Sequence, residues 1–362
     1  MKGIKKFTAN MVMGANVASI IVMLLIGYSD RLDPEQHPIL SCLGLVFPVL
    51  LAINLAFLIF WVVVSLKRVV VPMAGFLVCY SPIRTYVPLN LASSDKPDIR
   101  VLSYNAGGFS SDSKGVRGAG YEDALKYVEQ TDADVVCIQE ARVNEKFERR
   151  FKEKFPYVKF TDKRTSTSNR LAVLSKYPIV KQEDVEFESR GNLSVAFWLD
   201  VNGRTVIVVN NHLETAGLTS TERQDFRSMV HGDKETKEAR AETKRLLVKL
   251  SEGNVVRARQ AKSVCRFVKE HEGTPIILCG DFNDTPISYT VHKISEELSN
   301  CFRECGNGLG WTFCRDGIRV RIDHAFCSSE FSPVSCKVDK SVSASDHYPL
   351  VFGLKWNEKS QK

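Results

Sequence analysis

One stretch decides how this chain folds: Pro275-Ile-Ile-Leu-Cys-Gly-Asp281-Phe-Asn283-Asp-Thr-Pro286. Its first five residues are apolar and are followed by a glycine and several turn formers, a pattern typical of a buried β-strand. The predicted strand gives way to a loop at Asp281 and Asn283. Because binding and catalytic groups gather in loops at strand ends, this carboxylate and this amide are candidate site residues.

The same arrangement recurs along the chain. One β-type run ends at Asn105, another at Glu140 and a third at His212, and Asp-His pairs stand at positions 323–324 and 346–347. From Asp98 onward such runs alternate with amphipathic helical segments, which predicts an α/β fold. The predicted strands are Ile99–Ser103, Asp134–Gln139, Leu171–Ser175, Leu193–Leu199, Thr205–Asn210, Pro275–Cys279, Ile322–Phe326 and Leu350–Leu354. The predicted helices are Tyr121–Gln130, Asn144–Lys154, Val255–Lys269 and Ile287–Leu298.

The side chains at these strand ends are chemically related. Carboxylate and amide oxygens bind hard divalent cations, and an imidazole beside them transfers protons near neutral pH. Cys and His pairs at zinc spacing are few, so the set favours Mg²⁺ or Mn²⁺ over Zn²⁺. A single polar residue after a strand is most often a turn former. Repeated at several strand ends, this chemistry indicates a site for a hard cation with proton-transfer groups beside it.

The motifs, taken in order, resemble one known family. They are Ser-Tyr-Asn105, Ile-Gln-Glu140, Asn-Asn-His212-Leu, Gly-Asp281-Phe-Asn283-Asp, Arg-Ile-Asp323-His and Ser-Asp346-His347-Tyr-Pro. They are similar to motifs of the endonuclease/exonuclease/phosphatase superfamily, over about Asp98 to Lys355. The resemblance implies the DNase I-like fold, a four-layer α/β/β/α sandwich, and Mg²⁺-dependent hydrolysis of phosphate esters.

The resemblance also implies a metal side to the site. Glu140 would be the principal Mg²⁺ ligand, and Asn105 beside it would contact the metal or the substrate phosphate. Asp346 would complete the metal side. Mn²⁺ would serve in place of Mg²⁺.

The catalytic roles follow from the same resemblance. Asp281 would orient or deprotonate the attacking water, and Asn283 would donate a hydrogen bond to a phosphate oxygen. His347 would contact the scissile phosphate, with Asp323 setting its tautomer and orientation. His212 would lie near the leaving group. The general base, Asp or His, stays open.

Two arginines are candidate substrate-binding residues. Arg170 stands at the start of a predicted strand, and Arg321 lies just before Asp323. Guanidinium groups match the geometry of phosphate oxygens, so both could bind an anionic substrate. The alternative is that each is a solvated or structural arginine.

The N-terminal part, residues 1–86, differs from the rest of the chain. Phe7–Ser29 and Gln36–Leu66 contain no charged residue, and about 20 apolar residues suffice to span a bilayer. These runs predict transmembrane helices at about 9–28 and 38–66. A third run at 69–83 is short, and it either crosses the membrane or lies on its surface.

The charge distribution predicts the orientation of this anchor. Eight basic and four acidic residues precede Asp98, so this part carries +4 of the net +7. The basic N-terminus and Lys67-Arg68 would lie in the cytoplasm, and the acidic loop at 30–35 outside. We expect three crossings, which place the catalytic part outside the cytoplasm of a multi-pass cell-membrane protein. With two crossings it would be cytoplasmic.

The remaining organisation follows from composition. Residues 87–97 form a polar linker bounded by prolines, and 98–356 form the catalytic domain. Within that domain, 219–250 is rich in charge and predicts a helical excursion, either a solvated surface element or a lid over the site. A hydrophobic content of 44% excludes a disordered chain.

The sequence therefore predicts a membrane-anchored, Mg²⁺-dependent phosphoesterase that cleaves phosphodiesters. Its substrate would be nucleic acid or a phospholipid or phosphoinositide headgroup, its other partner would be the bilayer, and no protein partner can be inferred. The mild basicity after Asp98 tilts the choice away from long nucleic acid. The alternative is a catalytically inactive membrane scaffold with the same fold.

Overall fold

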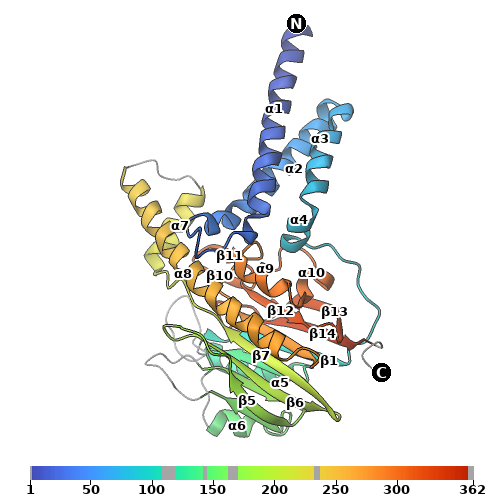
Figure 1. Cartoon of the computed structure of the whole chain (residues 1–362), viewed down its shortest axis with the longest axis vertical. Coiled ribbons are helices and arrows are strands. Elements are labelled where there is room, and N and C mark those ends of the chain that lie inside the picture. The colour runs from blue at the N-terminus through green and yellow to red at the C-terminus, as the bar shows by residue number, and fades with distance from the viewer. Residues whose placement is uncertain (1, 108–118, 142–144, 162–169, 232–236, 358–362) are drawn as a thin grey trace.

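The computed structural model describes residues 2–107, 119–141, 145–161, 170–231 and 237–357 (Figure 1). Its N-terminal helices are α1 (Lys2–Gly27), α2 (Phe47–Val64), α3 (Val70–Val78) and α4 (Tyr80–Tyr86), with 3-10 turns η1 (Ser29–Arg31), η2 (Leu40–Val46) and η3 (Leu66–Arg68). The later helices are α5 (Ala119–Gln130), α6 (Glu145–Phe151), α7 (Ser220–His231), α8 (Lys237–Glu270), α9 (Tyr289–Ser295) and α10 (Cys301–Cys305).

Two mixed six-stranded sheets form the centre of the catalytic part. The first has the order β13-β14-β1-β2-β4-β3, and the second the order β5-β6-β7-β8-β12-β9. The strands of the first sheet are β1 (Ile99–Asn105), β2 (Val135–Gln139), β3 (Tyr157–Phe160), β4 (Ala172–Ser175), β13 (Phe331–Val338) and β14 (Leu350–Trp356). Those of the second are β5 (Ile179–Asp184), β6 (Leu193–Val201), β7 (Arg204–His212), β8 (Ile276–Asp281), β9 (Ser299–Asn300) and β12 (Asp323–Cys327). A separate hairpin pairs β10 (Phe313–Arg315) with β11 (Ile318–Val320).

Three hydrophobic cores hold the layers together. The core between the sheets contains side chains from both, such as Val101, Phe197 and Phe352. A second core lies where α5 and α6 cover the first sheet, and a third where α8 and α9 cover the second. The predicted four-layer α/β/β/α sandwich is thereby confirmed.

All eight predicted strands are present, because each has a strong apolar run. The strands that were not predicted are short or polar at the surface; β5, for example, exposes Lys181, Gln182 and Glu183. Within the range of the predicted helical excursion, 219–250, the described residues form α7 and the start of α8, and the second helix does not end where expected. α8 is a 34-residue helix that continues into the predicted helix Val255–Lys269.

The N-terminal region has two helical segments that are long and apolar enough to cross a membrane, Lys6–Arg31 and Leu40–Val64. The pair α3 and α4, bent by 68°, would be a third crossing if it is one span. Two side-chain hydrogen bonds join α1 to α2: Asn54 donates to Ser19 Oγ (3.0 Å), and Trp61 Nε1 donates to Asn16 Oδ1 (3.2 Å). The chain runs toward the catalytic part in α1, away from it in α2 and back toward it through α3 and α4 (Figure 1).

Polar contacts fasten this helical region to the catalytic part. Lys262 Nζ lies 2.7 Å from Asp33 Oδ2, and Arg259 Nε lies 2.7 Å from Glu35 Oε1, so α8 pairs with the acidic loop after α1. Ile287 packs into the small core that Met23 and Phe47 form at the base of the helices. The acidic loop and the catalytic part are thus on the same side of the helical region.

Candidate functional site

Asp281, the last residue of β8, is at the centre of a polar cluster. Its Oδ2 accepts a hydrogen bond from Asn105 Nδ2 (2.8 Å), and it lies 3.7 Å from His212 Nε2 and 3.6 Å from His347 Nε2. The parallel pairing of β7 with β8 sets His212 beside Asp281. The ends of neighbouring strands thereby bring together side chains that were predicted to form the site.

Asp323 reaches the cluster from the antiparallel strand β12, where it is opposite Asp281. Its Oδ2 lies 2.8 Å from His347 Nδ1, which leaves His347 Nε2 to face Asp281. The Asp323 amide donates to Thr312 Oγ1 (3.0 Å), and the Phe313 ring packs edge-on against the His347 imidazole. The imidazole is therefore held in one orientation from two sides.

Burial and charge act in opposite directions on the His347 imidazole. Burial lowers its pKa, but the carboxylates of Asp323 and Asp281 outweigh that effect and raise the pKa to about 10. Burial also raises the pKa of the Asp281 carboxyl, which the positive charge of His347 opposes. The two carboxylates thus favour the charged form of the His347 imidazole.

Glu140 follows β2 directly and has a left-handed backbone, with φ +53°. Asn283 has φ +50°. Non-glycine residues rarely adopt this conformation, and it is concentrated at functional sites. The Glu140 side chain is 40% exposed, with Oε1 3.4 Å from Asn105 Nδ2 and 3.9 Å from His212 Nε2. Its carboxylate therefore faces the cluster from the solvent side.

The donor set of the cluster fits a metal ion. Ligand atoms of Asp281, Asp323 and His347 all lie within 4.8 Å of one another. Asp323 Oδ1 is buried without a hydrogen-bond partner among the described residues, and such an oxygen is costly unless a cation or water satisfies it. Carboxylate and amide oxygens dominate the cluster, which suits Mg²⁺.

Two further predicted residues lie close to the cluster. The Asn283 amide N–H donates to Asp281 Oδ1 (2.8 Å), while its side-chain Nδ2 donates to Leu213 O (3.0 Å). The Arg170 carbonyl accepts from the amide of Ala141, the residue after Glu140. The hydrogen bonds of Asn283 thus stabilise the loop that follows β8. Arg170 lies beside the residues that follow β2, which include Glu140.

Arg321, a predicted substrate-binding residue, is buried. Its guanidinium donates to the carbonyl oxygens of Leu309 (2.8 Å), Thr85 (2.6 Å) and Tyr86 (3.2 Å). These bonds use Nη1 and Nη2, while Nε has no hydrogen-bond partner among the described residues. Arg321 therefore ties the end of α4 to the catalytic part.

Asp346 lies at the rim of the site. Its Oδ2 pairs with Arg315 Nη1 (3.0 Å), and like Glu140 it is outside the group formed by Asp281, Asp323 and His347. Its role as a metal ligand stays a prediction.

One buried arginine that supports the site could not be predicted from the sequence. Arg257 of α8 lies 3.2 Å from Asp284 Oδ2, and its Nη1 donates to Glu214 O (2.8 Å). Asp284 follows Asp281 by three residues, and Glu214 follows His212 by two. Arg257 thus holds the loops after β7 and β8 together, although in the sequence it is one cation among many on a helix.

Comparison with known proteins identifies the class to which this chain belongs. The Endonuclease/Exonuclease/phosphatase family matches residues 102–347, more than half of the chain, so the protein belongs to that family. Its members are generally metal-dependent phosphoesterases and typically use Mg²⁺. A domain of unknown function (DUF8431) matches residues 9–86, and no curated protein matches the sequence.

Solved structures share the fold at low sequence identity. The catalytic domain of human Nocturnin with a bound sulfate anion is 15% identical, with TM-score 0.50, covering 74% of this chain and 97% of its own. An endonuclease/exonuclease/phosphatase from Beutenbergia cavernae DSM 12333 is 19% identical, with TM-score 0.51, covering 72% of each chain. TDP2 of D. rerio, complexed with a single-strand DNA product, is 14% identical, with TM-score 0.47, covering 71% and 98%.

Proposed function

We propose that the protein is a membrane-anchored, Mg²⁺-dependent phosphodiesterase. The observation that carries this proposal is the convergence of Asn105, Glu140, His212, Asp281 and His347 at one end of the two sheets, in a chain of this family. An inactive scaffold would have no need to keep these groups within contact distance.

The metal would be held by the oxygen atoms of the cluster. Glu140 and Asn105 would bind it from the rim, with the carboxylates of Asp281 and Asp323 beneath. When bound, Mg²⁺ supplies charge neutralisation at the phosphate and stabilises the leaving oxygen.

The side chains supply the proton transfers. Asp281 would orient the attacking water and accept its proton, since this carboxylate lies in contact with both imidazoles. His347, held by Asp323, would donate its Nε2–H to a phosphate oxygen as negative charge develops there. His212 would protonate the leaving oxygen from the opposite side of Asp281.

Metal removal tests the proposed reaction. We expect the purified full-length chain in detergent to hydrolyse bis-p-nitrophenyl phosphate with Mg²⁺, and EDTA to reduce turnover to background because the phosphate charge is no longer neutralised. Excess Mg²⁺ should restore the rate and serves as the control. Absence of turnover on every ester, with Mg²⁺ or Mn²⁺, would instead favour the inactive scaffold.

The class of diester is a separate question, because loops outside the cluster select the substrate. A panel of plasmid DNA, RNA, sphingomyelin and phosphoinositides would distinguish a nuclease from a phospholipid hydrolase. The 265 residues from Asp98 onward carry only +3 of the net charge, which supports a small headgroup over long nucleic acid.

The anchor and its orientation form the second part of the proposal. Arg68 Nη2 donates to Asn10 Oδ1 (2.8 Å), so Lys67 and Arg68 lie at the end of the helices opposite the catalytic part. With this basic end in the cytoplasm, three crossings place the acidic loop and the catalytic part outside it.

Fractionation and a topology reporter test the anchor. We expect the full chain to stay in the membrane pellet after alkaline carbonate washing, because α1 and α2 bury long apolar surfaces in lipid. A C-terminal reporter enzyme that is active only outside the cytoplasm should be active. Release by carbonate would contradict the anchor, and an inactive but intact reporter would contradict the orientation.

A further inference from the structure

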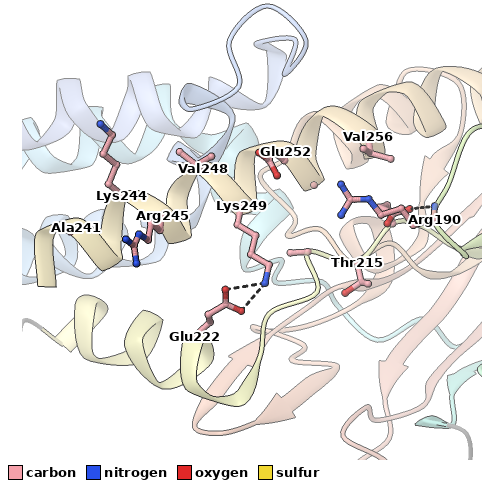
Figure 2. A pocket seen from close by; sticks show the side chains of 13 residues that line it. Arg190, Thr215, Glu222, Ala241, Lys244, Arg245, Val248, Lys249, Glu252 and Val256 are labelled. Atoms are coloured by element: carbon pink, nitrogen blue, oxygen red, sulfur yellow. Dashed lines mark hydrogen bonds and ion pairs between the residues drawn. The ribbon is translucent and has the colours of Figure 1, made fainter. Parts of the chain in front are cut away.

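A cavity of about 630 Å³ lies outside the cluster, between α7, the first half of α8 and the loop that follows His212 (Figure 2). Its walls include Arg190, Glu214, Arg245, Lys249 and Glu252. None of the residues of the cluster lines it. The cavity therefore needs its own explanation.

Several basic side chains line this cavity. Lys249 is neutralised by Glu222, at 2.9 and 2.7 Å, whereas Arg190, Lys244 and Arg245 have no ion-pair partner among the described residues. Figure 2 shows Arg245 pointing from α8 toward α7, Lys244 pointing away from α7, and Arg190 near Val256 at the other end of the cavity.

Two carboxylates also line the cavity. The Glu214 carboxylate accepts hydrogen bonds from the Ser189 hydroxyl (2.7 Å) and the Arg190 amide (3.2 Å), and Glu252 is exposed. Besides the Lys249–Glu222 pair, the lining therefore contains three cations and two carboxylates, and guanidinium groups are suited to a phosphate.

The cavity is next to η2, the turn between α1 and α2 at the base of the helical region. Asn254 of α8 donates to Ser41 Oγ (2.8 Å), and the carbonyl of Leu247 lies 4.0 Å from Cys42 Sγ. Ser41 and Cys42 belong to η2, which leads directly into α2. Since α2 is a predicted span, this wall of the cavity lies at the level of the bilayer surface.

Exposed apolar side chains surround the same place. Ile39 is 50% exposed, and Leu40, Val46 and Val248 are between 40% and 45% exposed. Figure 1 shows α7 and the start of α8 rising beside the lower end of α1. Apolar side chains next to basic ones are typical of a segment that lies in a membrane interface.

We propose that α7 and the first half of α8 lie on the bilayer surface, and that the cavity between them binds the phosphate of an anionic phospholipid headgroup. The guanidinium group of Arg245 binds the phosphate, Arg190 and Lys244 add to the attraction for the anionic surface, and Val248 contacts the lipid chains. This proposal rests on the membrane anchor proposed above. It assigns α7 and α8 a lipid-binding role in place of a freely solvated surface.

The test compares two lipid environments. The full chain is placed in nanodiscs of phosphatidylcholine alone or with one quarter phosphatidylglycerol, and hydrogen exchange is followed in peptides within 241–256. We expect exchange there to slow by roughly fivefold or more with the anionic lipid, since each basic side chain at a charged bilayer contributes about that factor. The combined substitutions Arg190→Gln, Lys244→Gln and Arg245→Gln should abolish the difference.

The control removes three exposed cations distant from the cavity. Lys152→Gln, Lys159→Gln and Lys337→Gln together should leave the lipid-dependent slowing intact. Equal exchange in both nanodiscs would overturn the proposal, as would full slowing in the variant without the cavity cations. Slowing by inorganic phosphate in phosphatidylcholine nanodiscs would overturn the lipid as ligand. Failure of the chain to insert into the nanodiscs would contradict the anchor itself, which separates the two outcomes.

Discussion

Substitution of Asp281 by asparagine is expected to lower phosphodiester hydrolysis by about 10²–10⁴-fold, the range typical for loss of a proton-transfer group. The side chain keeps its shape, so its bond with Asn105 has a near equivalent in the variant. What is lost is the negative charge between His212 and His347. The measurement is kcat on bis-p-nitrophenyl phosphate at saturating Mg²⁺.

Asp200→Asn is the matched control, since Asp200 stands at the opposite end of the β6–β7 hairpin, where it accepts a hydrogen bond from Gly203. It should hydrolyse the diester at the normal rate. A D281N chain with normal circular dichroism and full activity would rule out the proposed role of Asp281.

Gly280→Ala should damage both stability and activity. Gly280 has φ +140°, and a Cβ there would lie 1.9 Å from the backbone oxygen of Asn211 on β7. The two strands would have to separate at the point where they carry Asp281 and His212. We expect a loss of about 1–3 kcal/mol, as for overpacking of a core, which corresponds to a Tm lower by roughly 3–10 °C.

Activity should fall by about 10²-fold at temperatures where the variant is folded, because a shift of about 1 Å between reacting groups has that effect. Gly203→Ala is the control: its φ is +86°, but a Cβ there would have nothing within 4 Å. The Tm of Gly203→Ala should therefore fall only by the amount that the positive φ costs an alanine, without a steric clash. Equal losses of Tm in the two variants would contradict the steric explanation.

The parts of the site that could be predicted are those that follow a strand. Asn105, Glu140, His212 and Asp281 each come at or directly after the end of an apolar run, and strands that pair in register bring such ends together. The sheet order that makes them neighbours is not visible in any local pattern. It became predictable only through the resemblance to a family.

Arg321 and Asp346 show which contacts local reasoning does not predict. Arg321 stands two residues before Asp323, yet its guanidinium bonds to Thr85, 236 residues away in the sequence. Asp346 stands beside His347, yet its carboxylate pairs with Arg315. The partner of a long charged side chain depends on the nearest group of opposite polarity in space, and sequence spacing does not reveal it.

The sequence by itself determined the α/β class, the apolar N-terminal helices and the residue types of the site, because these depend on local hydrophobic periodicity and on short motifs. Only the tertiary structure decided how α8 docks against the acidic loop after α1, how Arg257 joins the loops after β7 and β8, and where the cationic cavity lies. These features are contacts between segments far apart in the chain. The free energy of such a contact depends on how deeply the two groups are buried and on the distance between them, and both are defined only in the folded chain.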